Sequence, residues 1–147
     1  MGSAGPDDKG GLDLATAYAV ETPDDSRDLY ARWASTYESG FIADNGYVYH
    51  LGVAGAFAGV ATASDGPVLD VGCGTGLVGG VLRAFGPWTV DGLDLSPEML
   101  DQARAKSDEG GDPVYRQLHE GDLTATLDLP TGGYGAVVSC GTFTHGH

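Results

Sequence analysis

The stretch VLDVGCGTGLVGG, residues 68–80, contains two overlapping glycine patterns. Counted from Asp70, it reads D-x-G-x-G-x-G, which is typical of a nucleoside-binding loop. Counted from Gly74, it reads G-x-G-x-x-G, the dinucleotide fingerprint. Both patterns place a glycine-rich turn between a strand and a helix, where backbone N–H groups and the helix N-terminus can meet a polar ligand. The stretch therefore predicts a ligand loop, and the rest of the chain has to decide the ligand.

Short apolar runs alternate with helical patterns after the chain breaker at 64–67, as is typical of parallel βα units. The expected strands are 67–71, 89–93, 114–118 and 135–139, and the expected helices are 76–84 and 97–106. Ser96 is a good N-cap for the second helix, and Pro97 fits its first turn. The pattern predicts an α/β fold, a Rossmann-like doubly wound parallel sheet.

The residues before the sheet divide into two expected parts. Residues 1–23 begin with a Gly-, Asp- and Pro-rich run and are expected to form a flexible lead. Apolar residues at helical spacing predict helices over 24–38 and 46–61. We expect residues 24–63 to form a helical lid and 64–147 the Rossmann-like half of a single domain, 24–147.

Composition excludes several classes of partner. The chain has 147 residues, a formal net charge of −14 and a pI near 4.2, so it would repel a phosphate backbone and an anionic membrane surface. We expect no nucleic-acid or membrane partner. No apolar run approaches the roughly 20 residues that span a bilayer, and no signal-peptide pattern opens the chain, so a cytoplasmic location is expected. The two cysteines and four histidines lack ligand spacing, so no metal site is expected.

Three aspartates discriminate between the two glycine patterns. Asp70 directly precedes the glycines, where a carboxylate would repel a pyrophosphate but suit a cation such as the ammonium or sulfonium of S-adenosylmethionine. Asp94 lies about twenty residues beyond the glycines, as expected of an acid that binds ribose hydroxyls. Asp122 follows the third strand and could accept a hydrogen bond from an adenine amino group beside Leu123. The aspartates therefore favour S-adenosylmethionine over a dinucleotide.

The chain resembles the class I S-adenosylmethionine-dependent methyltransferases over about residues 30–147. Four segments carry the resemblance: VLDVGCGTG (68–76), DGLDLSPEML (91–100), EGDL (120–123) and GAVVSCGTFTH (135–145). YARWASTYE (30–38) is similar to the opening of small-molecule methyltransferases, including the Williams-Beuren-region methyltransferase-like group. The resemblance implies methyl transfer from S-adenosylmethionine to a small-molecule acceptor, with S-adenosylhomocysteine as product.

The family's sheet has seven strands in the order 3-2-1-4-5-7-6. The resemblance therefore implies that this chain holds the first four strands, in the order 3-2-1-4, and is C-terminally truncated. The outer edge of the fourth strand would then offer unpaired backbone groups to a second copy or to another chain.

The resemblance also implies roles for residues near the strand ends. Asp94 would bind the ribose hydroxyls, and Leu95 would pack on the adenine. Asp122 would accept the adenine amino group beside Leu123, and Cys140 would form part of the pocket wall. The methionine end would be lined by Asp70, Gly72, Cys73, Gly74 and Gly76. The Tyr37 hydroxyl would reach the ligand from the lid, and His145 would act as a general base for the acceptor.

Two other functions stay open on the sequence. A non-catalytic module could keep the S-adenosylmethionine or nucleotide pocket without acceptor chemistry. An NAD(P)-dependent oxidoreductase would use Gly74, Gly76, Gly79 and Asp94 but leaves Asp70 and Asp122 without a role.

Overall fold

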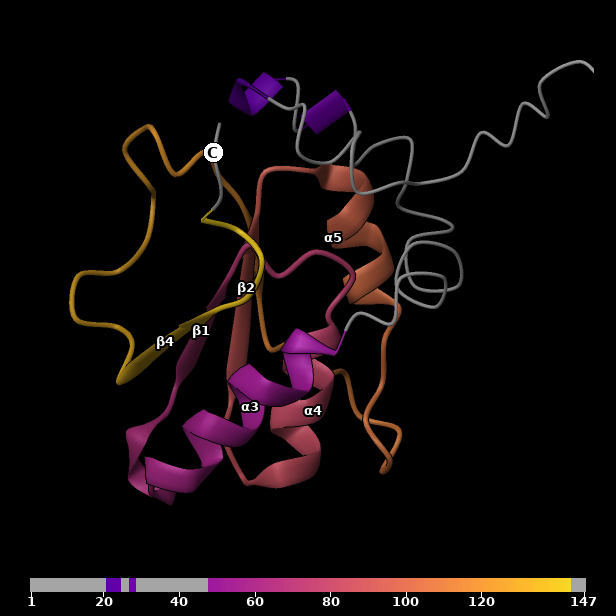
Figure 1. Ribbon diagram of the computed structural model, residues 1–147, viewed down its shortest axis with the longest axis vertical. Coiled ribbons are helices and arrows are strands. Elements are labelled where there is room, and N and C mark those ends of the chain that lie inside the picture. Colours follow the sequence, from indigo (N-terminus) through magenta and orange to yellow (C-terminus); the bar gives the residue numbers. More distant parts are fainter. Residues whose placement is uncertain (1–20, 25–26, 29–47, 144–147) are drawn as a thin grey trace, which may run out of the picture.

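Four parallel strands form one sheet in the order β3-β2-β1-β4 (Figure 1). A computed structural model describes residues 21–24, 27–28 and 48–143. The strands are β1 (Val68–Val71), β2 (Val90–Asp94), β3 (Leu118–Glu120) and β4 (Ala136–Ser139). The predicted strand order is confirmed. Val71, the last residue of β1, pairs with Leu93 and Ser139, so the carboxyl ends of β1, β2 and β4 lie together.

Three helices within residues 48–143 pack against one face of this sheet. They are α3 (Tyr49–Val60), α4 (Leu77–Phe85) and α5 (Pro97–Arg104). Their buried side chains form one apolar core with those of the strands: Ala54, Val78, Leu82, Leu100 and Ala103 from the helices, and Val68, Val90 and Val138 from the sheet. Trp88 attaches α3 to this core. Its ring packs edge to face on Phe57, with the ring centroids 4.9 Å apart, and its Nε1 donates to the Thr62 carbonyl at 2.8 Å.

The opposite face of the sheet is covered by chain without helices among the described residues. Leu69, Val71 and Leu93 pack there against side chains of the long connection between β3 and β4: Leu127, Leu129 and Tyr134. This connection is rich in turn formers, including Pro130, Gly132 and Gly133. Val137 of β4 remains 63% exposed on the sheet. The predicted α/β fold with a Rossmann-like parallel sheet is confirmed, and within the described residues α3, α4 and α5 lie on one face of that sheet.

The predicted third strand was wrong in position. The sequence favoured 114–118, but the ladder forms over Leu118–Glu120, where Leu118 pairs with Gly92. Val114 and Tyr115 are buried, but they lie in an irregular segment and not in a strand. Just before them, Ser107 and Pro113 form an isolated β-bridge. Their apolar character therefore reflects burial and not strand structure.

The second predicted helix is confirmed as α3. Leu51 shares the three-residue apolar spacing of Ala54 and Phe57, but it is 48% exposed, whereas Ala54 is fully buried. A Cβ added at Gly52, Gly55 or Gly59 would meet nothing within 4 Å, so these glycines serve no close contact. The strands predicted over 67–71, 89–93 and 135–139 and the helices predicted over 76–84 and 97–106 differ from the observed ones by one or two residues at their ends.

Most of the predicted lead and lid lies outside the described residues, including most of the helix predicted over 24–38. The described part of the predicted lid, α3, packs on α4 and contacts β4. The division into lead, lid and Rossmann-like half stays a prediction, as does the cytoplasmic location. Over the described ranges, each helix is too short or too polar to cross a bilayer.

Candidate functional site

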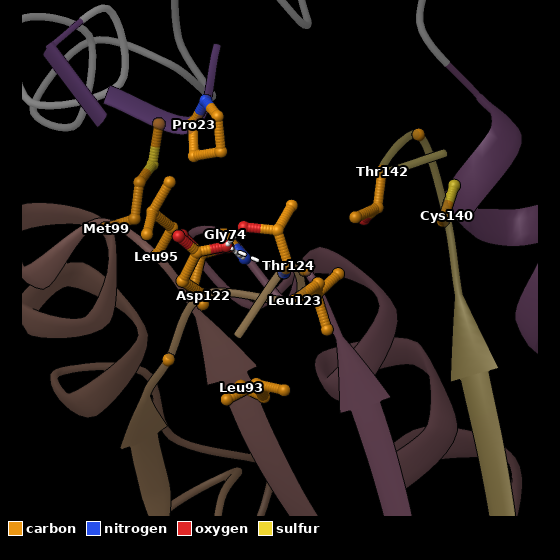
Figure 2. A pocket seen from close by; sticks show the side chains of 14 residues that line it. Pro23, Gly74, Leu93, Leu95, Met99, Asp122, Leu123, Thr124, Cys140 and Thr142 are labelled. Carbon is orange, nitrogen blue, oxygen red and sulfur yellow. Dashed lines mark hydrogen bonds between the residues drawn. The ribbon is translucent and has the colours of Figure 1, made fainter. Parts of the chain in front are cut away.

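A pocket opens at the carboxyl ends of β1, β2 and β4 (Figure 2). In parallel α/β sheets this edge is where ligands bind. In Figure 2, Leu95, Met99 and Pro23 lie on one side of the pocket and Cys140 and Thr142 on the other, with Leu93 deep between the strands. The residues that line it are Pro23, Gly72, Gly74, Leu93, Asp94, Leu95, Met99, Gly121, Asp122, Leu123, Thr124, Cys140, Gly141 and Thr142.

The glycine loop, residues 72–76, forms the inner wall of the pocket. Gly72, Gly74 and Gly76 have φ values of 67°, 53° and 98°, in the left-handed region that favours glycine. The Gly72 and Cys73 N–H groups both donate to the Leu93 carbonyl, at 2.8 and 3.0 Å. A Cβ at Gly72 would overlap the Thr142 side chain, so only glycine lets the loops after β1 and β4 meet here.

Asp94 joins the glycine loop to the end of β2. Its Oδ2 accepts the Gly74 N–H at 2.8 Å, and its Oδ1 accepts the Ser96 N–H at 2.9 Å. A carboxylate has about four acceptor positions. Asp94 can therefore brace the loop and still accept hydroxyl groups of a ligand, which is the role that the sequence predicted.

The far side of the pocket combines apolar side chains with a second carboxylate. Leu95, Met99 and Leu123 supply apolar surface, which suits the faces of a flat heterocycle. Asp122 Oδ1 accepts from the Thr124 N–H at 2.8 Å and the Thr124 hydroxyl at 2.7 Å. These hydrogen bonds, led by that of the hydroxyl, hold the pKa of Asp122 below its usual value. Asp122 is therefore an ionised acceptor at neutral pH.

Asp70 lies behind the glycine loop and does not line the pocket. It is 1% exposed, and its Oδ2 accepts the Tyr115 hydroxyl at 2.7 Å. Burial, against the hydrogen bond from Tyr115, raises the pKa of Asp70 to about 7. The sequence placed Asp70 in contact with the ligand, but the structure places it beneath the loop that would make the contact.

Cys73 and Gly76 also lie apart from the pocket lining. Cys73 is buried, and burial raises the pKa of its thiol well above the usual range, so it is an inert core side chain. Gly76 is the N-cap of α4. Of the five residues predicted at the methionine end, only Gly72 and Gly74 line the pocket.

The pocket brings together most of the other predicted residues. Asp94, Leu95, Asp122, Leu123 and Cys140 line it. Tyr37 and His145 lie outside the described residues. Groups of three or more His, Cys, Asp or Glu side chains that could hold a metal ion do not occur in the described part of the chain.

Several lining residues were missed by the sequence analysis. Met99 carried a usable signal, because it lies in the first turn of α5, three residues after the Ser96 N-cap and close to Leu95. Gly121 and Thr124 flank Asp122 and Leu123, which were predicted. Pro23 was assigned to the lead, and nothing in its sequence context indicates that it reaches the pocket.

Comparisons with known proteins identify relatives of this chain. A family model described as a methyltransferase domain matches residues 68–147. Human methyltransferase-like protein 27 is 34% identical over 124 residues, which is 80% of this chain and 46% of that protein. The 18S rRNA (guanine-N(7))-methyltransferase of Bos taurus is 39% identical over 72 residues, 49% of this chain and 23% of that protein.

A solved structure, DesVI of Streptomyces venezuelae, is 29% identical and superposes with a TM-score of 0.42 over 62% of this chain and 36% of that one. The chain therefore spans less than half the length of each of these three proteins.

Proposed function

The chain belongs to the methyltransferase domain family, and we propose that its pocket binds S-adenosylmethionine for methyl transfer to a small-molecule acceptor. The observation that carries the proposal is the position of Asp94. Its carboxylate lies between the glycine loop, which it binds through the Gly74 N–H, and the apolar wall formed by Leu95 and Met99. A nucleoside with a charged tail needs this succession of surfaces.

The residues present fit the adenosine part of the cofactor. The Asp94 carboxylate would accept the two ribose hydroxyls. Leu95, Met99 and Leu123 would contact the faces of the adenine, and the ionised Asp122 would accept its amino group.

The glycine loop and the loop after β4 fit the methionine part. Gly72, Gly74 and Gly141 bring backbone without side chains to this end of the pocket. The Asp94 carboxylate, which accepts the Gly74 N–H, gives the region a negative potential that suits a cation. An anionic pyrophosphate would be repelled there, which weighs against the dinucleotide alternative.

When bound, the sulfonium supplies a methyl group that is already activated for in-line displacement. The chain's own residues then have to orient the acceptor and exclude water. Thr142 and Cys140 lie at the end of β4, on the side of the pocket that an acceptor would approach. His145 would take a proton from an acceptor that must lose one. An unchanged pH profile of turnover in His145→Ala, in a form of the protein with activity, would remove His145 from this role.

A small molecule is the proposed acceptor because the net charge of −14 opposes an RNA. The Bos taurus relative acts, by its name, on 18S rRNA. Competition binding distinguishes a small-molecule acceptor from RNA. At physiological salt, added RNA is expected to change neither the binding of S-adenosylhomocysteine nor the electrophoretic mobility of the chain. A saturable complex with RNA under those conditions would contradict the small-molecule assignment.

Calorimetric titration with S-adenosylhomocysteine and with NAD tests the proposal. We expect S-adenosylhomocysteine to bind and NAD to bind at least about 100-fold more weakly. Asp94→Asn should weaken S-adenosylhomocysteine by about tenfold or more, because it removes the charge that receives two hydroxyl groups and the Gly74 N–H. Asp101→Asn on the exposed side of α5 is the matched control and should bind like the wild type. Tight binding of NAD alone would overturn the proposal.

A further inference from the structure

Tyr115 is a buried tyrosine that the proposed chemistry does not use. It lies in the irregular segment before β3, and its ring reaches under the glycine loop to the start of α4. Its hydroxyl donates to Asp70 Oδ2 at 2.7 Å. The contact links two residues 45 positions apart in sequence, both of them behind the pocket wall.

Three glycines make room for the Tyr115 ring. A Cβ at Gly76 would lie 2.9 Å from Tyr115 Cε2, and one at Gly92 would lie 3.2 Å from Cδ1. A Cβ at Gly79 would collide with the hydroxyl oxygen and with the ring. Because Gly76 ends the glycine loop and Gly79 lies in the first turn of α4, the ring contacts the segment that sets the loop's position.

The Tyr115 hydroxyl donates to the Asp70 carboxyl group, on which no cation acts among the residues that the structure describes. The groups that act on Asp70 are the Tyr115 hydroxyl, the Gly79 backbone N–H and the Asp94 carboxylate, and Asp70 in turn acts on the Cys73 thiol. Asp94 repels a charge on Asp70, so within the described ranges the two hydrogen-bond donors are what stabilise that charge. A phenylalanine at 115 would fill the same space and leave Asp70 with one donor fewer.

We propose that Tyr115 is a positioning residue for cofactor binding: its hydroxyl fixes Asp70, its ring fixes Gly76 and Gly79, and together they hold the glycine loop in its binding conformation. This inference rests on the proposed function, because the loop is taken to contact S-adenosylmethionine. Tyr115 itself does not line the pocket.

Tyr115→Phe tests the inference, and the chain offers a matched control. Tyr134 also donates its hydroxyl to a buried strand aspartate, Asp91 Oδ2 at 2.8 Å, but on the opposite face of the sheet. Both variants delete one such hydroxyl and keep the ring. By calorimetry at 25 °C, Tyr115→Phe should raise the dissociation constant of S-adenosylhomocysteine by about tenfold. Tyr134→Phe should also be less stable than the wild type, but its dissociation constant should stay within about twofold of the wild-type value.

A double-mutant cycle shows whether Tyr115 acts through Asp70. In an Asp70→Asn background, the carboxyl group that the hydroxyl serves is gone, so Tyr115→Phe should change the dissociation constant by less than about twofold. A purely structural role of Tyr115 would give the same loss in both backgrounds, and that result would overturn the inference. Should Tyr115→Phe not fold, Gly79→Ala probes the same contact by crowding the ring and must also weaken binding.

The possible failures are distinguishable. A wild-type chain that does not bind S-adenosylhomocysteine overturns the proposed function, and the inference with it. A wild-type chain that binds, with equal binding by Tyr115→Phe or equal losses in Tyr115→Phe and Tyr134→Phe, overturns the inference alone.

Discussion

Two aspartates buried in neighbouring strands differ in charge because their partners differ. Asp91 in β2 is 0% exposed, and its carboxylate receives two hydrogen bonds from Arg116, at 3.0 and 2.7 Å, and one from Tyr134. Burial pushes the pKa of Asp91 up, but these hydrogen bonds outweigh burial and hold it below the usual value. Asp70 in β1 has Tyr115 in place of an arginine, so burial wins and raises its pKa to about 7.

This difference predicts how stability depends on pH. The pKa of Asp70 is about 7 in the folded chain and roughly 3.9 in the unfolded chain, so the folded state binds the extra proton between these values. The stabilisation is complete below about pH 4 and is lost as pH rises through 7. We therefore expect the melting temperature to fall from pH 5 to pH 8, and Asp70→Asn to reduce that fall.

Thermal unfolding followed by circular dichroism at several pH values measures this effect. Asp91 does not interfere in the range, because its lowered pKa places its contribution below about pH 4, where stability is lost as pH falls. Parallel curves for wild type and Asp70→Asn between pH 5 and 8 would show that Asp70 is already ionised in the folded chain.

At the scale of elements, the sequence was sufficient where burial and turn signals agree. Strands β1, β2 and β4 are short apolar runs between breakers, and their predicted ends are within one residue of the observed ones. The position of β3 could not be read in this way, because Val114 and Tyr115 enter the core without a strand. The apolar spacing of α3 includes Leu51, which is exposed, since the positions of α4 and the sheet decide which side of the helix is covered.

The start of α5 was predicted correctly and connects helix stability with the pocket. Ser96 is the N-cap, and its Oγ accepts the Met99 N–H at 3.2 Å. Ser96→Ala should cost about 1 kcal/mol of unfolding free energy. Because Met99 lines the pocket, Ser96→Ala should also weaken the binding of S-adenosylhomocysteine severalfold.

Thr62 provides the control for this prediction. Its side chain caps the 3-10 helix η2 (Ala63–Asp65). Thr62 and the residues of η2 do not line the pocket. Thr62→Ala should lower the melting temperature in heat denaturation and the midpoint in urea denaturation. It should leave the dissociation constant of S-adenosylhomocysteine unchanged. If both variants lose stability and neither loses affinity, α5 does not set the pocket wall.

At the scale of the whole molecule, the sheet assembles a site from segments far apart in sequence. The parallel register brings the glycine loop after β1, Asp94 at the end of β2 and Gly141 after β4 to one edge. The family predicted from four short motifs is confirmed by the match over residues 68–147. Those motifs include Asp94, Asp122 and Cys140, and this is why most of the predicted residues line the pocket.

What the sequence could not show is which motif residues face the pocket and which support it. Asp70 and Gly72 are two positions apart, yet one is buried against Tyr115 and the other lines the cavity. That division depends on a side chain 45 residues away and on the space left by Gly79. The predicted association through the outer edge of β4 stays a prediction, to which the exposed Val137 gives a starting point for mutation.

The most direct test of the proposed site is a map of backbone amide shifts by nuclear magnetic resonance as S-adenosylhomocysteine is added to the isotope-labelled chain. The largest saturable shifts are expected at Gly74, Leu95, Leu123 and Gly141, which surround the pocket, and Gly110 and Ala136 should stay unchanged. Shifts that do not saturate, or that cluster on the opposite face around Tyr134, would contradict the binding of S-adenosylmethionine at the ends of β1, β2 and β4.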